Sequence, residues 1–239
     1  MARILNIGER LSKIVDLCPE ATVIADIGCD HGYVACELVL ENKARMVIAT
    51  EKSEQCLLKA VALANQINIA PFMSFRTGDG FEAITKHDKV DFCVIAGMGG
   101  LEIIEILKKR PKHLFDFVLQ PMNNVLELRN YLINHHFKIL VDKKVCEKGK
   151  YYDLIRVTYG ENNFADIEIF FGKSNFKGRN IKTFYAYLTE RKNELLKLKR
   201  EVGALSANTQ KELEYVEKAL ALFENDERAH GDDDGESNE

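Results

Sequence analysis

Short apolar runs alternate with amphipathic segments over the first 160 residues of the chain. Five of the runs, TVIADIG, RMVIATE, SFRTGD, VDFCVIAG and FDFVLQP, are largely continuous in apolar and β-branched residues. Parallel strands that are covered on both faces have this composition. The segments between them, YVACELVLENK, SEQCLLKAVALANQ, LEIIEILKKR and VLELRNYLINHH, have helical periodicity. The pattern predicts an α/β fold in which strands and helices form right-handed crossover units around a parallel sheet.

Two further strand-like runs end this region. FKILVDKKVCEKG and KYYDLIRVTYG are joined through residues 147–150. So short a connection suits only antiparallel neighbours. We therefore expect residues 1–160 to form one domain with an antiparallel hairpin at the end of its sheet.

The rest of the chain has a coiled-coil pattern. Apolar residues recur in two heptad positions, which Arg191 interrupts: Ile181, Leu188, Leu195 and Val202, with Phe184, Leu198 and Leu205. Thr209 and Glu212 are spaced as a capping box, and Leu213, Val216, Leu220 and Phe223 continue the spacing. This predicts a helical hairpin, an antiparallel coiled coil, over residues 161–225. The pattern leaves open whether the protein is a monomer or a coiled-coil dimer.

Charge is distributed unevenly. The formal net charge is −4, but the last fifteen residues hold seven acids and one arginine, so residues 1–224 carry +2. Residues 226–239 are expected to form a disordered acidic tail, which does not argue against a polyanionic partner. Residues 173–218 carry eleven lysines and arginines against six acids. Such a basic hairpin suits a nucleic-acid backbone, although exposed coiled-coil faces are often charged anyway.

The cysteines and the N-terminus indicate a cytoplasmic protein. The six cysteines form no C-x-x-C pair, and several lie in apolar runs, so we interpret them as reduced core thiols rather than zinc ligands. The first residues lack the apolar stretch and cleavage site of a leader, and no later segment is long enough to span a membrane. We expect neither a metal nor a membrane partner.

The stretch ADIGCDHGY resembles a nucleotide-binding glycine loop but lacks its middle glycine. It follows a predicted strand and precedes a helix, where open α/β sheets bind ligands, and Gly28 and Gly32 are separated by Cys-Asp-His. Asp26 and Asp30 would repel a pyrophosphate, whereas they would attract the amino group and sulfonium of S-adenosylmethionine. The loop therefore favours that cofactor over a dinucleotide.

Further acids follow the next two strands. Glu51 ends the second strand, where a carboxylate can accept both ribose hydroxyls, and Asp79, before Gly80, can accept the adenine amino group. Any one of these acids taken alone is more often a turn or cap residue, and Asp79 in particular suits a turn. Three acids at successive strand ends favour a cofactor site.

Glycines and amides follow the fourth and fifth strands. Gly97, Gly99 and Gly100 surround Met98 and would admit a flat ligand, or simply form a tight turn. After the fifth strand come Gln120, Pro121 and Asn123. The amides suit the reading of a base edge, although Asn123 is also placed to cap the next helix.

These motifs together resemble one family, the bacterial tRNA (adenine(22)-N1)-methyltransferases, or TrmK family. The matching stretches are Arg10-Leu11, DIGCDHGY, TGDGF, IAGMGG, QPMN and EKGKYYDLIRV. The resemblance implies a class I, Rossmann-like methyltransferase domain with a C-terminal coiled coil, which methylates N1 of an adenine in the D-loop region of tRNA. Adenine N1 carries an in-plane lone pair, so the reaction needs no strong base.

Roles for the remaining candidates follow from this chemistry. Asp30 would stabilise the positive charge that the adenine gains, and His31 would orient the base together with Asn123. The alternative is that Asp30 caps the helix and His31 is a turn residue. Arg10, Tyr151 and Tyr152 are candidates for binding phosphate or a base, or form a surface ion pair and a core aromatic.

Two other functions remain open from the residues alone. One is a class I methyltransferase that acts on a protein or a small metabolite and uses the hairpin for dimerisation. The other is a non-catalytic binding module with a methyltransferase-like fold. The complete set of Asp26, Gly28, Glu51 and Asp79 argues against the second.

Overall fold

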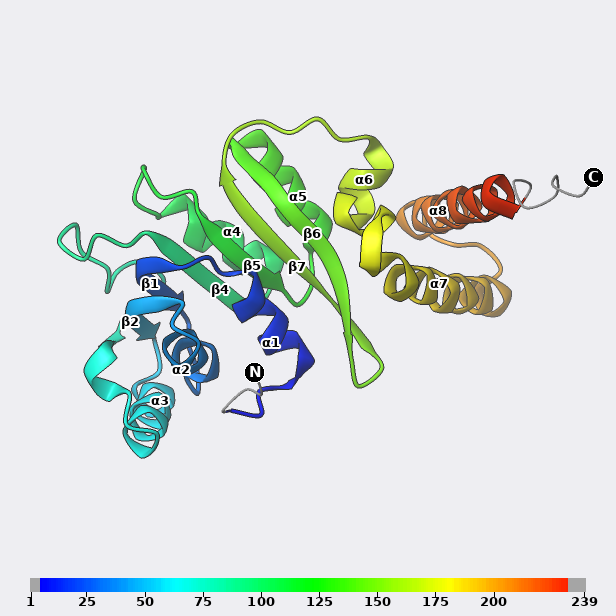
Figure 1. Cartoon of the computed structure of the whole chain (residues 1–239). Helices are drawn as coiled ribbons and strands as arrows, with labels where there is room; N and C mark the ends of the chain where they lie inside the picture. The colour runs from blue at the N-terminus through cyan, green and yellow to red at the C-terminus, as the bar shows by residue number, and fades with distance from the viewer. Residues whose placement is uncertain (1–4, 232–239) are drawn as a thin grey trace, which may run out of the picture. The chain divides into compact units, whose positions relative to one another are not determined.

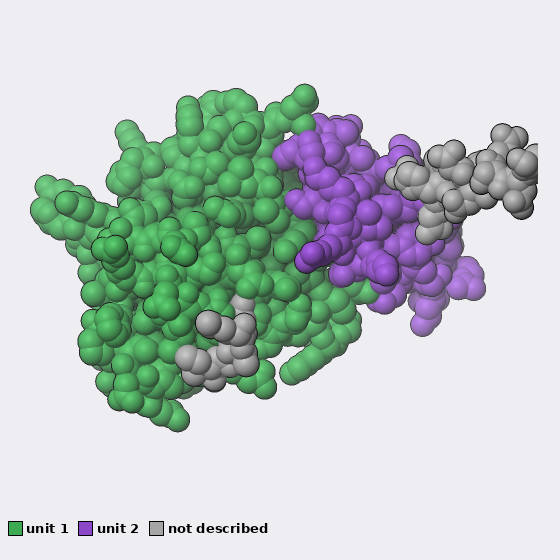
Figure 2. Space-filling model, in the orientation of Figure 1, with its two compact units in different colours: residues 1–163 green, residues 164–239 purple. Residues whose placement is uncertain are grey.

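A computed structural model describes residues 5–231 of the chain, which divides into two compact units, residues 1–163 and 164–239 (Figure 2). The first unit contains a seven-stranded sheet with the order β3-β2-β1-β4-β5-β7-β6 (Figure 1). The strands are β1 (Ala21–Ile27), β2 (Ala44–Glu51), β3 (Met73–Thr77), β4 (Phe92–Met98), β5 (Phe117–Pro121), β6 (Phe137–Glu147) and β7 (Lys150–Tyr159).

Strands β1 to β5 are parallel, and the chain reverses only at the hairpin. β1 pairs with both β2 and β4, and β5 pairs with β4, all in parallel register. β7 pairs antiparallel with both β5 and β6. This confirms the predicted α/β class and the terminal antiparallel hairpin. Because the carboxyl ends of parallel strands lie at one edge of the sheet, the loops after β1 to β5 meet there.

Helices cover both faces of the sheet. α1, α2 and α3 pack together on one face, while α4 and α5 pack together on the other (Figure 1). Their bounds are α1 (Gly8–Leu17), α2 (Tyr33–Leu40), α3 (Glu54–Gln66), α4 (Gly100–Lys108) and α5 (Val125–Asn134), with a short 3₁₀ turn η1 (Ala70–Phe72) before β3.

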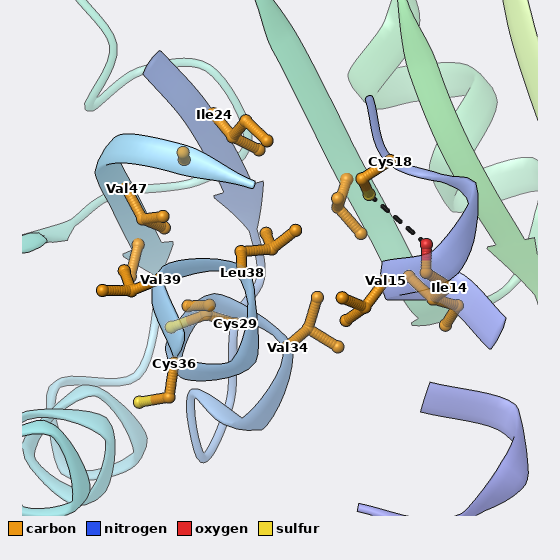
Figure 3. Close-up of a cluster of buried hydrophobic side chains, with 14 of the residues drawn as sticks. Ile14, Val15, Cys18, Ile24, Cys29, Val34, Cys36, Leu38, Val39 and Val47 are labelled. Atoms are coloured by element: carbon orange, nitrogen blue, oxygen red, sulfur yellow. Dashed lines mark hydrogen bonds between the residues drawn. The ribbon is translucent and has the colours of Figure 1, made fainter. Parts of the chain in front are cut away.

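Helix α1 is an element that was not predicted, although the sequence contains a signal for it. Leu11, Ile14, Val15 and Cys18 have the spacing of a helical apolar face. Ile14 and Val15 are fully buried, and the Cys18 thiol donates to the Ile14 carbonyl over 3.3 Å (Figure 3). Burial raises the pKa of the Cys18 thiol to about 12, so it behaves as a core residue.

The second unit has its own aromatic core. It contains α6 (Asp166–Phe171), the 3₁₀ turns η2 (Lys173–Phe176) and η3 (Gly178–Asn180), and the adjacent helices α7 (Ile181–Val202) and α8 (Ala207–Gly231). The buried residues include much of the predicted heptad pattern: Phe171, Phe184, Leu188, Leu195, Leu213, Val216, Ala219, Leu220 and Phe223. Arg191 interrupts the pattern because its guanidinium forms two hydrogen bonds with Glu212 of the facing helix, of 2.7 and 3.0 Å.

The structure corrects three details of the predicted hairpin. Ser206, rather than Thr209, caps α8, because its hydroxyl accepts from the Thr209 amide over 3.3 Å while Glu212 pairs with Arg191. Leu198 and Val202, which belong to the predicted heptad pattern, are instead 39% and 57% exposed. Helix α8 continues to Gly231, beyond residue 225 where the predicted hairpin ends, and residues 232–239 of the predicted tail (226–239) lie outside the described part.

Candidate active site

A cavity of about 550 Å³ opens at the carboxyl ends of the parallel strands. Its lining includes predicted residues from α1, from the ends of β1, β2 and β4 and from the loops after β1 and β3, namely Arg10, Asp26, Gly28, Asp30, His31, Glu51, Asp79, Gly80, Gly97 and Met98. Five segments far apart in the chain therefore meet in one site. The parallel sheet is what brings them together, because each strand delivers its following loop to the same edge.

Asp26 lies at the bottom of the site with a carboxylate oxygen that lacks a partner. The residue is 3% exposed, and its Oδ2 atom forms no hydrogen bond with any described residue. Burial raises the pKa of Asp26 to about 7; a backbone hydrogen bond from Ala35 opposes this shift and the nearby Glu51 carboxylate adds to it. Such a group is costly to keep in an empty fold and gains most from a cationic ligand.

The glycine loop adopts a conformation that larger residues would resist. Gly28 and Gly32 have φ angles of +73° and +75°. A Cβ atom at Gly28 would collide with the Met98 side chain, and one at Gly32 would come within 2.6 Å of the Ala60 Cβ on α3. Gly32 thus permits close packing of α2 on α3 rather than lining the cavity, whereas Gly28 is required mainly by its positive φ angle, because the Met98 methyl group is the end of a flexible side chain.

Glu51 ties the glycine loop to the end of β2. Its Oε2 atom accepts from the Asp30 amide over 3.2 Å, and its Oε1 atom accepts from the Ser53 amide over 3.0 Å. The residue is 9% exposed. One carboxylate therefore fixes the loop and remains at the cavity wall. Asp79, by contrast, is exposed in the turn after β3, where the Glu82 amide donates to its carbonyl over 3.1 Å.

Asp30 and His31 form a pair at the cavity. His31 Nδ1 lies 2.7 Å from Asp30 Oδ2, and His31 Nε2 lies 3.4 Å from Lys59 Nζ. Partial burial raises the pKa of Asp30, but hydrogen bonds from His31 and Cys56 and the charge of Lys59 outweigh it and lower the pKa overall. The N-cap of α2 is Gly32, without a side-chain bond, so Asp30 is not the cap of this helix.

The Arg10 guanidinium is held at the cavity wall by neutral groups. It donates to Gln120 Oε1 and lies over the Tyr152 ring, 5.3 Å from the centroid. The Arg10 amide donates to Glu147 Oε1 over 3.0 Å, which fixes the start of α1 to the β6–β7 hairpin. Among residues 5–224, no carboxylate forms a salt bridge with the Arg10 guanidinium, so its charge is available to a ligand.

Gln120 does not have the predicted base-reading role. It is fully buried, and its Oε1 atom accepts from both Arg10 and the Gly97 amide. Its Nε2 atom donates to the Pro121 carbonyl over 2.9 Å and contacts Met122 Sδ at 3.4 Å. Because both ends of the amide are used inside the protein, Gln120 instead supports Arg10 and the β4 tip.

The other predicted residues of the β4 and β5 tips and of the hairpin lie outside the cavity lining. These are Gly99, Gly100, Pro121, Asn123, Tyr151 and Tyr152. Asn123 is exposed, and the alternative role as a cap is wrong, since Asn124 is the N-cap of α5 and makes no side-chain cap bond. Gly100 is buried at the start of α4.

The cavity also contains residues that sequence analysis missed. They include Leu11, Tyr33, Lys52, Glu102, Ile106 and Met122. Tyr33 and Met122 belong to the motifs DIGCDHGY and QPMN, so their positions next to predicted residues were a usable signal. Glu102 and Ile106 lie on α4, and the sequence contains no signal for their position at the cavity, because only the packing of that helix brings them there.

Within the described part of the chain, no cluster of three or more histidine, cysteine or acidic side chains is arranged to hold a metal ion. Nor does any described helix combine the length and apolar character that a membrane span requires.

Comparison with known proteins decides the family. The sequence model described as TrmK, tRNA (adenine(22)-N(1))-methyltransferase, matches residues 24–225. The chain belongs to this family. The match covers the sheet, the cavity loops and most of the helical hairpin, and it confirms the resemblance seen in the motifs.

Individual proteins that are similar to this chain support the same family assignment. The tRNA (adenine(22)-N(1))-methyltransferase of Bacillus subtilis strain 168 is 32% identical over 164 residues, which are 67% of this chain and 68% of that protein. Streptococcus pneumoniae Sp1610, solved in complex with S-adenosyl-L-methionine, is 25% identical with a TM-score of 0.80 over 90% of this chain and 99% of that one. The TrmK of M. capricolum, solved with S-adenosyl-homocysteine, shares the fold at 24% identity, with a TM-score of 0.79 over 90% and 98% of the two chains.

Proposed function

We propose that this TrmK-family chain transfers the methyl group of S-adenosylmethionine to N1 of adenine 22 in tRNA. The observation that carries the proposal is the buried Asp26 carboxylate, with its unpartnered oxygen, in a cavity shared with Glu51 and Asp79. Family membership supports the same reaction.

The residues present fit the proposed cofactor. Asp26 would bind its ammonium group, and Arg10, which sequence analysis assigned to the substrate, would bind its carboxylate, since both line the same cavity. Glu51 would accept the ribose hydroxyls, and Asp79 the adenine amino group. When bound, the cofactor supplies an activated methyl group on a sulfonium centre. The cavity volume of about 550 Å³ lies within the usual range of small-molecule sites.

The chain's own contribution is positioning and electrostatics. N1 of the target adenine would attack the methyl carbon in line while the bond between that carbon and the sulfonium sulfur breaks. The positive charge would pass from sulfur to the purine ring, and S-adenosylhomocysteine would leave, without any proton transfer. Asp30, whose pKa is lowered and which is therefore ionised, would stabilise that charge while His31 keeps its carboxylate oriented. N1 lies on the Watson–Crick edge, so the adenine must be unpaired or turned out before it reacts.

The helical unit would bind the tRNA backbone. Lys197, Lys199 and Arg200 line a groove on α7 and are exposed. Such side chains bind phosphates without reading sequence.

The deciding experiment is methyl transfer to tRNA. Purified protein is incubated with tritiated S-adenosylmethionine and an unmodified tRNA transcript, and the product is digested to nucleosides. We expect label in 1-methyladenosine, and none when the target adenine is replaced by guanine. Label in protein or small molecules instead, or cofactor binding without any transfer, would contradict the proposal.

Asp30→Asn is expected to bind the cofactor nearly as wild type but to transfer the methyl group much more slowly. A charge-stabilising group of this kind contributes roughly 2.7–4 kcal/mol, or about 10²–10³ in rate. Single-turnover transfer at saturating tRNA measures the step, with calorimetry for cofactor affinity. An unchanged single-turnover rate would exclude Asp30 from the transition state.

Replacing Lys197, Lys199 and Arg200 together by glutamine is expected to weaken tRNA binding while cofactor affinity stays the same. The slope of log K against log salt should flatten by about 2–3, because each lost phosphate contact removes about 0.7–0.9. Filter binding at several salt concentrations measures both. A triple glutamine variant at Lys86, Lys89 and Lys112 controls for net charge. Equal effects of the two triple variants would contradict a specific role of α7.

A further inference from the structure

Two large apolar side chains are exposed at the cavity. Tyr33 is 44% exposed and Met122 is 51% exposed, and both belong to the cavity lining. None of the proposed cofactor contacts uses either of them. Exposed apolar surface at a cavity marks a place where a ligand completes the burial.

The fold places these two residues in or directly after the loops on either side of the β4 tip. Tyr33 is the first residue of α2, directly after the glycine loop that follows β1, and Met122 directly follows β5. In the sheet, β4 lies between β1 and β5. The Met122 amide donates to the Met98 carbonyl over 2.8 Å, which fixes the β5 loop to the tip of β4.

Tyr33 has an aromatic neighbour within the protein. Its ring lies nearly parallel to that of His31, with centroids 6.1 Å apart and 11° between the planes. His31 is in turn held by Asp30 at 2.7 Å. This contact favours one orientation of the Tyr33 ring, which lowers the entropy cost of stacking a second flat group on its exposed part.

The chemistry of this region differs from that of the cavity floor. Asp26 and Glu51, both buried, provide carboxylates that suit the polar groups of a cofactor. Tyr33 and Met122 instead offer a flat ring and a polarisable thioether. Aromatic rings stack on nucleobases in single-stranded or turned-out conformation, and a methionine adapts its shape to an aromatic face.

We propose that Tyr33 and Met122 form the two walls that hold the target adenine over the tip of β4. The inference rests on the proposed function and adds the binding site of the base to it. Tyr33 supplies the stacking surface, Met122 closes the opposite side, and the base lies where Asp30 and the β4 tip meet.

The test compares Tyr33→Leu, Tyr33→Phe and Met122→Ala in the full-length protein, with kcat/KM for an unmodified tRNA transcript as the readout. Tyr33→Leu is expected to lose roughly 5- to 150-fold in kcat/KM, the effect of removing one base–aromatic stack. Tyr33→Phe keeps the ring and should remain within about threefold of wild type, and Met122→Ala should show a smaller loss than Tyr33→Leu. Phe72→Leu is the matched control, because Phe72 is an aromatic residue that is 52% exposed and lies outside the cavity. This variant should have the kcat/KM of the wild type.

Two controls keep the interpretation specific. Affinity for S-adenosylmethionine, measured by calorimetry, and the thermal transition should be unchanged in all four variants. Wild-type kcat/KM in Tyr33→Leu or Met122→Ala, or a cofactor affinity that falls by the same factor as kcat/KM, would overturn the base site while leaving the proposed function intact. Wild-type protein that binds cofactor but methylates no tRNA would overturn both.

Discussion

Asp26→Asn is expected to abolish useful cofactor affinity and at the same time to stabilise the cofactor-free protein at neutral and alkaline pH. Removing one charged partner from a buried, hydrogen-bonded contact costs about 2–5 kcal/mol of binding. The stabilisation has a separate cause, because Asp26 is 3% exposed and its pKa in the fold is raised to about 7. Folding therefore disfavours its charged form.

The pH dependence follows from that shift. The folded protein holds a proton on Asp26 that the unfolded chain releases near the ordinary value of 3.8, so the stabilising contribution is complete below pH 3.8 and is lost as the pH rises to about 7. Over this pH range, the free energy of unfolding of the wild type should fall by up to about 4 kcal/mol relative to that of Asp26→Asn. This figure follows from about 1.4 kcal/mol for each unit of the pKa shift.

Urea unfolding at pH 5 and pH 8 measures the difference in the free energy of unfolding between the wild type and Asp26→Asn. Calorimetry measures the affinity of both proteins for the cofactor. Glu20→Gln, an exposed acid next to the start of β1, is the control and should follow wild type. Wild-type cofactor affinity in Asp26→Asn would disprove the assignment of the ammonium site. Equal stability differences at both pH values would disprove the pKa shift.

Asp142→Ala is expected to destabilise the protein by about 3–5 kcal/mol, because it leaves a buried guanidinium without one of its carboxylates. Arg129 Nε and Nη2 donate to Asp142 over 2.7 and 2.8 Å, and Nη2 also donates to Asp153 over 2.8 Å. Lys144 Nζ completes the network at 2.9 Å from Asp153. The four side chains are at most 8% exposed, so water cannot replace the lost partner.

A double variant separates charge from packing. Arg129→Leu together with Asp142→Leu removes the pair and leaves Lys144 with Asp153, so it should cost less than Asp142→Ala alone. Chemical denaturation of the three proteins at pH 7 makes the comparison. If the double variant is less stable than Asp142→Ala, then lost packing, rather than an unpaired charge, causes most of the destabilisation.

This network also bears on the active site. It joins α5 to β6 and β7, and the same hairpin carries Glu147 and Tyr152, which hold Arg10. Partial unfolding of the hairpin would therefore displace the cavity's Arg10. We expect that destabilised variants retain cofactor binding only as long as this hairpin remains folded.

The order of strands and helices was predictable because it depends on local periodicity. Continuous apolar runs such as VDFCVIAG can be buried only when both faces of a strand are covered, and the helical segments between them have one apolar face. The loops after the strands were predictable for the same reason, since parallel strands present their following loops at one edge. Asp26, Glu51 and Asp79 could thus be placed in one site without knowledge of any distance.

Only the tertiary structure decided which polar residues face the cavity and which serve the protein itself. Gln120 and Asn123 lie in one motif, yet the first is fully buried between Arg10 and Gly97 and the second is exposed. Likewise Glu212 pairs with Arg191 across two helices rather than completing a capping box. Periodicity and motif spacing constrain the neighbours of a residue along the chain, whereas the partner that satisfies an amide or a carboxylate comes from elsewhere in the sequence. The sequence by itself therefore determined the fold class, the family and the edge of the sheet where the site forms, and packing between distant segments decided the hydrogen-bond partner of each side chain there.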